Sequence, residues 1–376
     1  MRTALLVGGS GPTGPHVVEG LAERGYAVTL LHRGNHELPE LARHEHLHAD
    51  PHFRDSLDEA LAGRTFDVVV AAYGRLRLVA DAVAGRCGAF VAVSGLPAYA
   101  GYHDPGSTGS HGMAVLARED AVDRGRAVSA DEVAVEEPGE GFSRKIRAGE
   151  LHVLDHHHEG SFSASLVRYP SIYGPRQVYP REWSVVRRVL DGRDRIILPD
   201  NGLTVAMRCA AENAAAFLLA ALDRPDAAAG ETFNAGDRDQ LTMRQWVAVC
   251  AAAAGGQLNP VSLPFDLAGP GRGLYPVGHD EHLLADTHKA ADLLGYTEPV
   301  AAADALAATV RWYVENPPAE SAASLRDPFD YAEEDRVIEA YRRATADLLA
   351  AQEPTGPTVH PYAHPKVAGE RDHRGR

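Results

Sequence analysis

The N-terminal stretch of the chain reads Thr3-Ala4-Leu5-Leu6-Val7-Gly8-Gly9-Ser10-Gly11-Pro12-Thr13-Gly14. The continuous apolar run is typical of a strand buried on both faces of a parallel sheet, and the glycines after it open a predicted helix over 17–24. The first glycine of Gly8-x-x-Gly11-x-x-Gly14 permits a tight turn, and the second lets the backbone approach a pyrophosphate. The third allows close packing of the helix on the sheet, with the helix N-terminal amides facing the phosphates. This strand–turn–helix context therefore predicts a dinucleotide-binding site.

Short apolar runs and helical spacings alternate after this turn. Strands are expected at 27–31, 67–72 and 89–93, with helices at 57–62 and 79–84. The alternation predicts an α/β fold with a doubly wound parallel Rossmann sheet, right-handed crossovers and a smaller C-terminal α+β substrate domain. We expect a nucleotide-binding domain over 1–170 completed by parts of 205–235, a substrate domain mainly over 171–315, a helical extension over 316–352 and a disordered tail over 353–376.

Composition narrows the class of partner. The 376 residues carry a net charge of −15, which argues against a nucleic-acid or membrane-surface binder because both need a basic surface. No apolar run reaches the ~18 residues of a membrane span, and the opening residues lack the pattern of a secretory signal. The three cysteines, Cys87, Cys209 and Cys250, form no disulfide framework or zinc spacing, so a cytoplasmic location is expected. The expected partner is a small-molecule substrate.

The second predicted strand should end beside the adenine ribose, where an acidic residue selects a free 2′-hydroxyl. This chain has His32-Arg33-Gly34 there instead. A guanidinium suits a 2′-phosphate, so NADP(H) is favoured over NAD(H); alternatively, Arg33 is a solvated loop residue. Asp50, at the end of the third strand, is a candidate acceptor for the adenine amino group.

Four segments give the chain a family resemblance. They are 8–14, Val91-Ala92-Val93-Ser94-Gly95-Leu96-Pro97-Ala98-Tyr99, Val167-Arg168-Tyr169-Pro170-Ser171-Ile172-Tyr173-Gly174-Pro175-Arg176 and Thr232-Phe233-Asn234-Ala235-Gly236. From about residue 3 to 313 the chain resembles the extended short-chain dehydrogenase/reductases, the NAD-dependent epimerase/dehydratase family. The resemblance implies a nicotinamide cofactor and a substrate held by the C-terminal domain. The candidate cofactor-binding residues are Gly8, Gly11, Pro12, Thr13, Gly14, His32, Arg33, Asp50, Ala71, Ala72, Ser94, Lys145, Tyr169 and Pro170.

The family resemblance also implies a Ser/Thr, Tyr and Lys catalytic set, in which the lysine charge lowers the tyrosine pKa. The family's Tyr-x-x-x-Lys places Phe142 at the tyrosine and Ile146 at the lysine, or else Gly141 with Lys145. Neither register has a phenol, so the motif is degenerate and non-standard residues are expected to move the proton. The candidates are Lys145, Ser94, Tyr99, Tyr102 and Tyr173. A solvated lysine and packed tyrosines are the alternatives.

Arginines suit an anionic substrate. Arg168, Arg176 and Arg208 fall where extended family members bind phosphorylated or nucleotide-like substrates, and structural ion pairs are the alternative. His103 lies on the long Gly- and His-rich loop after Tyr99, where a titratable imidazole could serve as a general base.

Two histidine groups have spacings that could suit a metal. His44, His46 and His48 alternate along a predicted strand and lie near His52, and His152 and His156 are four apart on a predicted helix. Neither group has a carboxylate at motif spacing, so no metal site is predicted.

Three functions remain open at this point. The first is an NAD(P)-dependent oxidoreductase or epimerase, acting on a small polar or nucleotide-like substrate with non-standard acid/base residues. The second is a non-redox isomerase, cyclase or lyase on the same scaffold. The third is a catalytically inactive protein that senses NADP(H). A homodimer is possible in each case.

Overall fold

The computed structural model describes residues 2–108, 112–122, 140–319, 324–353, 356, 365–372 and 374–375. They belong to two compact units, Met1–Phe329 and Asp330–Arg376. The second unit contains helix α12 (Tyr331–Ala350), whose first turn is capped by Asp330 because its carboxylate accepts a hydrogen bond from the Glu333 amide at 2.8 Å. The predicted disordered tail at 353–376 lies partly outside the described residues and stays a prediction.

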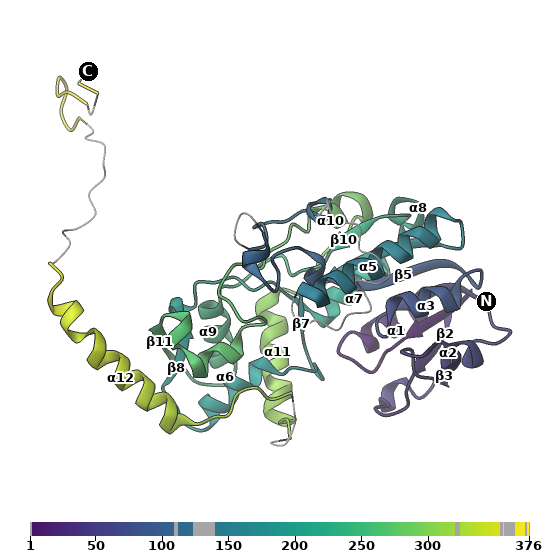
Figure 1. The fold of residues 1–376 in the computed structure, drawn as a ribbon, viewed down its shortest axis with the longest axis horizontal. Helices are drawn as coiled ribbons and strands as arrows, with labels where there is room; N and C mark the ends of the chain where they lie inside the picture. Colours follow the sequence, from purple (N-terminus) through teal and green to yellow (C-terminus); the bar gives the residue numbers. More distant parts are fainter. Residues whose placement is uncertain are drawn as a thin grey trace. The chain divides into compact units, whose positions relative to one another are not determined.

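The first unit is built on a seven-stranded parallel sheet (Figure 1). Its strands are β1 (Arg2–Val7), β2 (Tyr26–His32), β3 (Glu45–His48), β4 (Phe66–Ala71), β5 (Cys87–Gly95), β6 (Ser163–Tyr169) and β10 (Thr232–Asn234), in the order β10-β6-β5-β4-β1-β2-β3. Val7 pairs with Leu31 of β2 on one side and with Ala71 of β4 on the other. The predicted doubly wound sheet is therefore confirmed.

Helices cover both faces of this sheet because alternate residues of each strand point to opposite faces. Leu6 packs in the core beneath α1 (Gly14–Glu23), α7 (Ala211–Asp223) and α10 (His288–Leu294). Leu5 and Val7 pack in the core beneath α2 (Arg54–Ala60), α3 (Leu76–Val83) and α5 (Glu140–His158). Helices α1 and α7 approach closely at Gly20, where a Cβ atom would lie 2.2 Å from Leu219 Cδ1.

A third hydrophobic core, in addition to the two on the faces of the sheet, lies in the part of the chain after β6. Trp246, Val185, Leu198 and Val310 are buried in it. Its elements are β7 (Ser171–Tyr173), α6 (Arg181–Leu190), β8 (Arg195–Pro199), β9 (Arg208–Ala210), α9 (Met243–Ala253), β11 (Asn259–Leu263) and α11 (Ala302–Glu315). Strands β7 and β9 pair in parallel, as do β8 and β11, and the short α8 (Pro225–Ala228) precedes β10. The predicted domain bounds stay a prediction.

The long segment after β5 is packed rather than loose where it is described. Tyr102, Met113 and Ala117 are buried together with Met207 and Leu283 from the later part of the chain. Short 3-10 turns at Leu96–Ala98, Pro105–Ser107 and Glu119–Ala121 shape the backbone. A fourth small core therefore anchors the predicted functional loop.

The chain reverses its direction of strand addition at β1, since β2 lies on one side of it and β4 on the other. In open α/β sheets, ligands bind outside the carboxyl ends of the strands at such a switch point. The Gly8 turn follows β1 at this edge, which is where the sequence predicts the nucleotide site.

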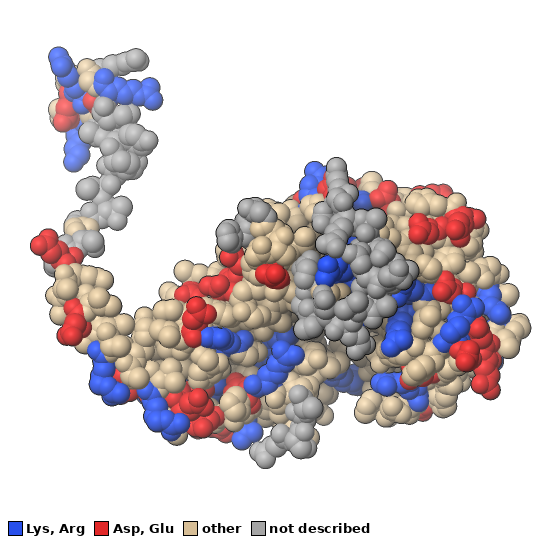
Figure 2. Space-filling model, in the orientation of Figure 1, with Lys and Arg blue, Asp and Glu red and all other residues tan. Residues whose placement is uncertain are grey.

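The charges on the surface are mixed. On the face drawn in Figure 2, basic and acidic side chains are interspersed. Among the described residues, no helix is long and apolar enough to cross a bilayer.

Candidate active site

The turn after β1 requires glycine at several positions. Gly8 and Gly9 have φ values of 112° and 104°, which L side chains rarely adopt. A Cβ on Gly14 would lie 1.9 Å from the carbonyl oxygen of Gly9, whereas a Cβ on Gly11 would meet nothing within 4 Å. Gly14 therefore closes the turn, and Gly11 faces open space into which a ligand could approach.

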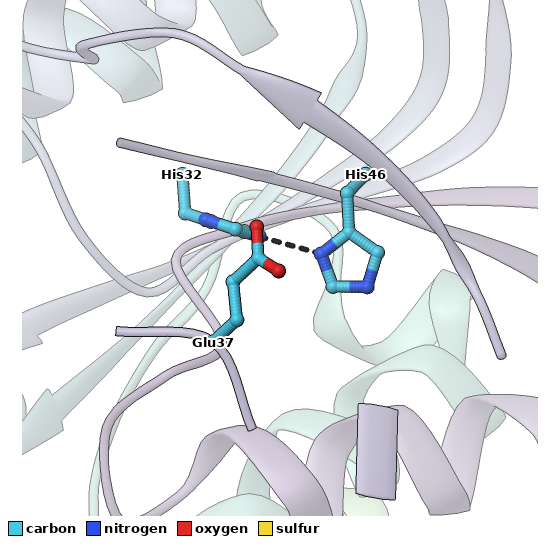
Figure 3. Close-up of side chains that lie close together, drawn as sticks. All are labelled: His32, Glu37 and His46. Carbon is cyan, nitrogen blue, oxygen red and sulfur yellow. Dashed lines mark hydrogen bonds between the residues drawn. The ribbon is translucent and has the colours of Figure 1, made fainter. Parts of the chain in front are cut away.

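The carboxyl ends of β2 and β3 carry a chain of hydrogen-bonded histidines (Figure 3). The Gly34 amide donates to His32 Nδ1 at 3.0 Å, so a neutral His32 carries its proton on Nε2. His32 Nε2 lies 2.7 Å from His46 Nδ1, and His46 Nε2 lies 3.0 Å from the Leu41 carbonyl oxygen. Each imidazole thus donates to the next acceptor, and burial together with His46 and His48 lowers the pKa of His32.

This histidine chain does not suit a metal, although Glu37 lies beside His32 and His46. Metal binding through His32 Nε2 would move the proton to Nδ1 and break the hydrogen bond from Gly34. Glu37 is also engaged, because its Oε1 lies 2.7 Å from His48 Nε2. Of the predicted strand histidines, His46 and His48 lie together here, while His52 pairs with Asp50.

The two remaining residues predicted to bind the adenosine lie at this edge of the sheet. The Arg33 guanidinium is exposed and lies 5.7 Å from the centre of the Tyr73 ring. Asp50 accepts hydrogen bonds from the backbone and the imidazole of His52 at 3.0 and 2.8 Å, which lower the pKa of its carboxyl. Arg33 is therefore available to a phosphate, whereas Asp50 Oδ1 is already engaged within the protein.

The other predicted cofactor residues lie where the strands end. Ala71 ends β4 and Ala72 follows it, and the Ala72 amide donates to the Val7 carbonyl. Tyr169 and Pro170 follow at the end of β6, and the Tyr169 hydroxyl donates to the Ala214 carbonyl at 2.8 Å.

A buried polar network lies behind the ends of β5 and β6. Glu150 and Arg168, which are 0% and 1% exposed, form a bidentate ion pair at 2.7 and 2.8 Å. Ser94 Oγ donates to Glu150 Oε1 at 2.6 Å, and Arg168 donates to the Tyr99 hydroxyl at 3.1 Å. Tyr99 in turn donates to Asn234 Oδ1 at 2.9 Å. Arg168 is thus held by the protein core, and the structure leaves it no accessible surface for a substrate.

The candidate phenols are poorly placed for proton transfer. Burial raises the pKa of Tyr99, raises the pKa of Tyr102 to about 12 and raises the pKa of Tyr173 further. The Tyr173 hydroxyl also donates to Asp237 at 2.7 Å. A catalytic tyrosine needs the opposite shift, so the described environment gives none of these three an acidic phenol.

Lys145 and Ser94 line one cavity of about 670 Å³ between α3 and α5. Lys145 is half-buried and makes no hydrogen bond or ion pair with the part of the chain that the structure describes. Arg75 and Arg77 line the same cavity. Three cationic side chains and one carboxylate, that of Asp81, therefore line this cavity.

A second cavity, of about 300 Å³, adjoins the glycine turn at Pro12. Tyr102, His103 and Arg181 line it from the long loop and α6. His103 is half-buried, and its Nε2 is a buried atom without a hydrogen-bond partner among the described residues. Burial and the neighbouring His279 lower the pKa of His103, which favours a neutral imidazole near pH 7.

Phe142 lies beside this histidine, with the two ring centres 5.7 Å apart. Its side chain is 47% exposed. One of the two predicted registers of the family motif puts Phe142 at the tyrosine, and there the structure has an exposed benzyl ring beside the His103 imidazole.

The remaining predicted arginines are engaged elsewhere. Arg176 forms an ion pair with Glu40 at 2.7 Å. Arg208 is 8% exposed, lies 4.5 Å from the Trp246 ring centre and donates to the Ala206 carbonyl. A different arginine, Arg181, which the sequence analysis missed, lines the second cavity, and its Nε is buried without a partner among the described residues. Its position one residue after Pro180 gave no motif signal.

Comparison with known proteins agrees with this architecture. The family model described as the NAD dependent epimerase/dehydratase family matches residues 121–236. A dTDP-glucose 4,6-dehydratase from Streptomyces griseus is 28% identical over 180 residues, which are 47% of this chain and 50% of that protein. The match therefore spans about half the length of this curated relative. These findings agree with the resemblance to the NAD dependent epimerase/dehydratase family that the sequence motifs indicated.

Solved structures show the same fold over most of the chain. The UDP-glucose 4-epimerase of Thermotoga maritima, solved with UDP-glucose, matches with a TM-score of 0.65 at 17% identity, over 84% of this chain and 99% of its own. A dTDP-glucose 4,6-dehydratase from Streptomyces venezuelae, solved with NAD, matches with a TM-score of 0.61 at 22% identity, over 84% and 98%. At these identities the likeness establishes the fold.

Proposed function

We propose that this protein is an epimerase/dehydratase-type enzyme that binds a nicotinamide dinucleotide and acts on a nucleotide sugar. The observation that carries the proposal is the glycine turn, where Gly14 lies against the Gly9 carbonyl and Gly11 faces open space at the sheet's switch point. A nicotinamide supplies reversible hydride transfer when it is bound. The residues that would hold the dinucleotide are Gly8, Gly11, Pro12, Thr13, Gly14, Arg33, Ala71, Ala72 and Lys145.

Arg33 supports a preference for NADP(H). Its guanidinium is exposed just after β2, where His32 replaces the acidic residue that would repel a 2′-phosphate. A charge-assisted hydrogen bond to phosphate is worth about 1.5–3 kcal/mol, or about tenfold or more in affinity.

Arg33→Ala is therefore expected to weaken NADPH binding by about tenfold or more and to leave NADH binding unchanged. Fluorescence titration of both reduced nucleotides measures this. Arg43→Ala is the matched control, because Arg43 is also exposed and precedes β3. Equal losses for NADH and NADPH would refute recognition of the 2′-phosphate by Arg33, and tighter NADH binding by the wild type would assign NAD(H).

The second cavity supports an anionic substrate. Burial lowers the pKa of Arg181, which still presents a cationic fork to the cavity beside Gln177 and Tyr102. Arginine forks bind phosphate oxygens in pairs. The diphosphate of a nucleotide sugar, such as the UDP-glucose in the Thermotoga maritima structure, has the matching charge.

His103 is the residue we infer to be the acid/base group. It lines the second cavity and contacts Phe142, and its Nε2, which has no hydrogen-bond partner among the residues that the structure describes, can accept a proton. An imidazole at this point would take the role of the tyrosine phenol that this chain lacks in the family motif. General acid–base catalysis of this kind contributes about 10²–10⁴-fold.

His103→Gln is accordingly expected to lower kcat by about 10²–10⁴-fold with a much smaller change in KM. The assay supplies NAD⁺ or NADP⁺ with UDP-glucose or dTDP-glucose and follows water loss or isomerisation by mass spectrometry and NMR. His158→Gln, on an exposed position of α5, is the control. Full activity of His103→Gln would refute its role, while nucleotide binding without turnover of any nucleotide sugar would favour the sensing protein.

A non-redox enzyme is the second candidate, and one observation favours it. Burial raises the pKa of Tyr99, Tyr102 and Tyr173, so none of the candidate phenols is suited to proton transfer. Product formation without a transient change in nicotinamide absorbance would support this candidate over hydride transfer. Cytoplasmic location and a homodimer stay predictions of the sequence.

A further inference from the structure

A second set of metal-type side chains lies on the opposite side of the sheet from α1, between α3 and α5. His152 and His156 are one helical turn apart on α5, so both side chains lie on one face of the helix. Asp81 of α3 faces them, and its Oδ1 lies 2.6 Å from His152 Nε2 and 2.9 Å from His156 Nε2. Three donor atoms from two helices thus converge within 4.8 Å of one another.

We propose that Asp81, His152 and His156 form a binding site for a divalent transition metal of the zinc type, which joins α3 to α5. Zinc bonds to imidazole nitrogen and carboxylate oxygen are about 2.0–2.2 Å long, so tetrahedral ligands lie about 3.3 Å apart. The two nitrogen–oxygen distances would need to widen by only about half an ångström to accept the ion. Two imidazole donors and a carboxylate are a donor set that zinc favours.

The surroundings fit a metal ligand set better than they fit a plain ion pair. Both imidazoles direct Nε2 at the same carboxylate oxygen, which places all three donors around one point. The other ring nitrogen of His156 lies 3.3 Å from Ser161 Oγ, an outer partner that would fix the ring orientation. The His32 group lacks this arrangement, since its ring nitrogens are used in a linear chain of hydrogen bonds.

The open side of this site faces a cavity. Asp81 and His152 both line the cavity of about 670 Å³ that also contains Lys145 and Ser94. A zinc ion held by three protein ligands keeps a fourth position for water or another ligand, and here that position would face the cavity. Arg75, Arg77 and Lys145 on the same wall favour an anion as that fourth ligand.

The same three cationic side chains repel the positively charged metal and therefore lower the expected affinity of the site for it. Arg54 also interacts electrostatically with Asp81. Because only three protein ligands bind and positive charges lie nearby, we expect a Kd of the order of 1 µM, weaker than that of structural zinc sites.

The test uses the full chain without an affinity tag, stripped of metal with a chelator. Titration with Zn²⁺ in a calorimeter is expected to show one saturable site per chain. The double variant His152→Ala/His156→Ala is expected to lose at least ~100-fold in affinity, since even outer partners of metal ligands are worth 10–100-fold. Co²⁺ in place of Zn²⁺ is expected to give visible absorption bands of a tetrahedral site with the wild type only.

Controls separate this site from the other histidines. His158→Ala lies on the same helix and His46→Ala lies in the other histidine group, and both should bind Zn²⁺ like the wild type. Asp81→Asn keeps the side-chain volume and removes the charge, so it tests the site if the double variant unfolds, which circular dichroism reports. No saturable binding to the wild type, or unchanged binding by the folded double variant or by Asp81→Asn, would overturn the proposal.

Discussion

Glu150→Gln is expected to lower the free energy of unfolding by about 3–5 kcal/mol, because it leaves the guanidinium of Arg168 uncompensated in the core. The pair is 0% and 1% exposed, and no solvent can replace the lost charge. Chemical denaturation of the wild type and the variant measures the difference. Asp58→Asn breaks the exposed pair between Arg54 and Asp58 and should cost less than about 1 kcal/mol.

The double variant Glu150→Leu/Arg168→Met should recover part of the lost stability, because two packed apolar side chains replace the buried pair. Arg147, which also pairs with Glu150 at 2.8 Å, is partly exposed, so water can solvate its charge when Glu150 is replaced. A Glu150→Gln variant as stable as the wild type, or a double variant no more stable than Glu150→Gln, would contradict this account of the pair.

The Glu150 pair also predicts a pH dependence. Burial opposes ionisation, but the charge of Arg168 and its hydrogen bonds outweigh it and lower the pKa of Glu150 from its usual value of 4.5. A carboxyl whose folded-state pKa is depressed stabilises the fold above its unfolded pKa. This stabilisation is lost as the pH falls below 4.5 and through the folded-state pKa. The stability difference between the wild type and Glu150→Gln should therefore shrink over the same acid range.

Gly14→Ala is expected to abolish dinucleotide binding and to destabilise the protein, whereas Gly11→Ala should abolish binding alone. The Cβ at position 14 would overlap the Gly9 carbonyl oxygen at 1.9 Å, so the turn itself must move. The Cβ at position 11 meets no protein atom within 4 Å, and it would occupy the space that a pyrophosphate needs. We expect at least ~100-fold weaker binding for both variants, since closely approaching backbone donors are displaced.

Thermal unfolding and NADPH titration, run on both variants, separate these effects. A lower Tm is expected for Gly14→Ala and an unchanged Tm for Gly11→Ala. If Gly11→Ala binds the nucleotide as tightly as the wild type, the open space at this glycine is not the pyrophosphate site.

The sequence was sufficient to predict the sheet and its glycine turn because both depend on local patterns. A strand buried in a parallel sheet appears in the sequence as a continuous apolar run. Gly14 is needed because the helix begins so close to the preceding turn that a Cβ would overlap the Gly9 carbonyl. The family resemblance also predicted that the tyrosine position holds Phe142 or, in the other register, Gly141, and this assignment stays a prediction. These signals involve residues close together along the chain.

The identity of the side chains that meet across the fold could not be predicted in the same way. Glu150 and Arg168 are adjacent in space but come from α5 and β6. Asp81 lies 71 residues before His152, so the carboxylate that completes this histidine group was absent from every local spacing. Arg181 begins α6, and the packing of α6 in the core after β6 brings it to the cavity at Pro12. No single sequence motif indicates that contact.

The segment between β5 and α5 has a consequence for how reactants exchange. Tyr102 and Met113 are buried in one core with Met207 and Leu283. The segment that carries Tyr102 is therefore packed against a part of the chain about 100 or more residues later. Moving this segment away from Met207 and Leu283 would expose several apolar side chains to water at once. We therefore expect Tyr102 to line the second cavity in the same position before and after a reactant binds.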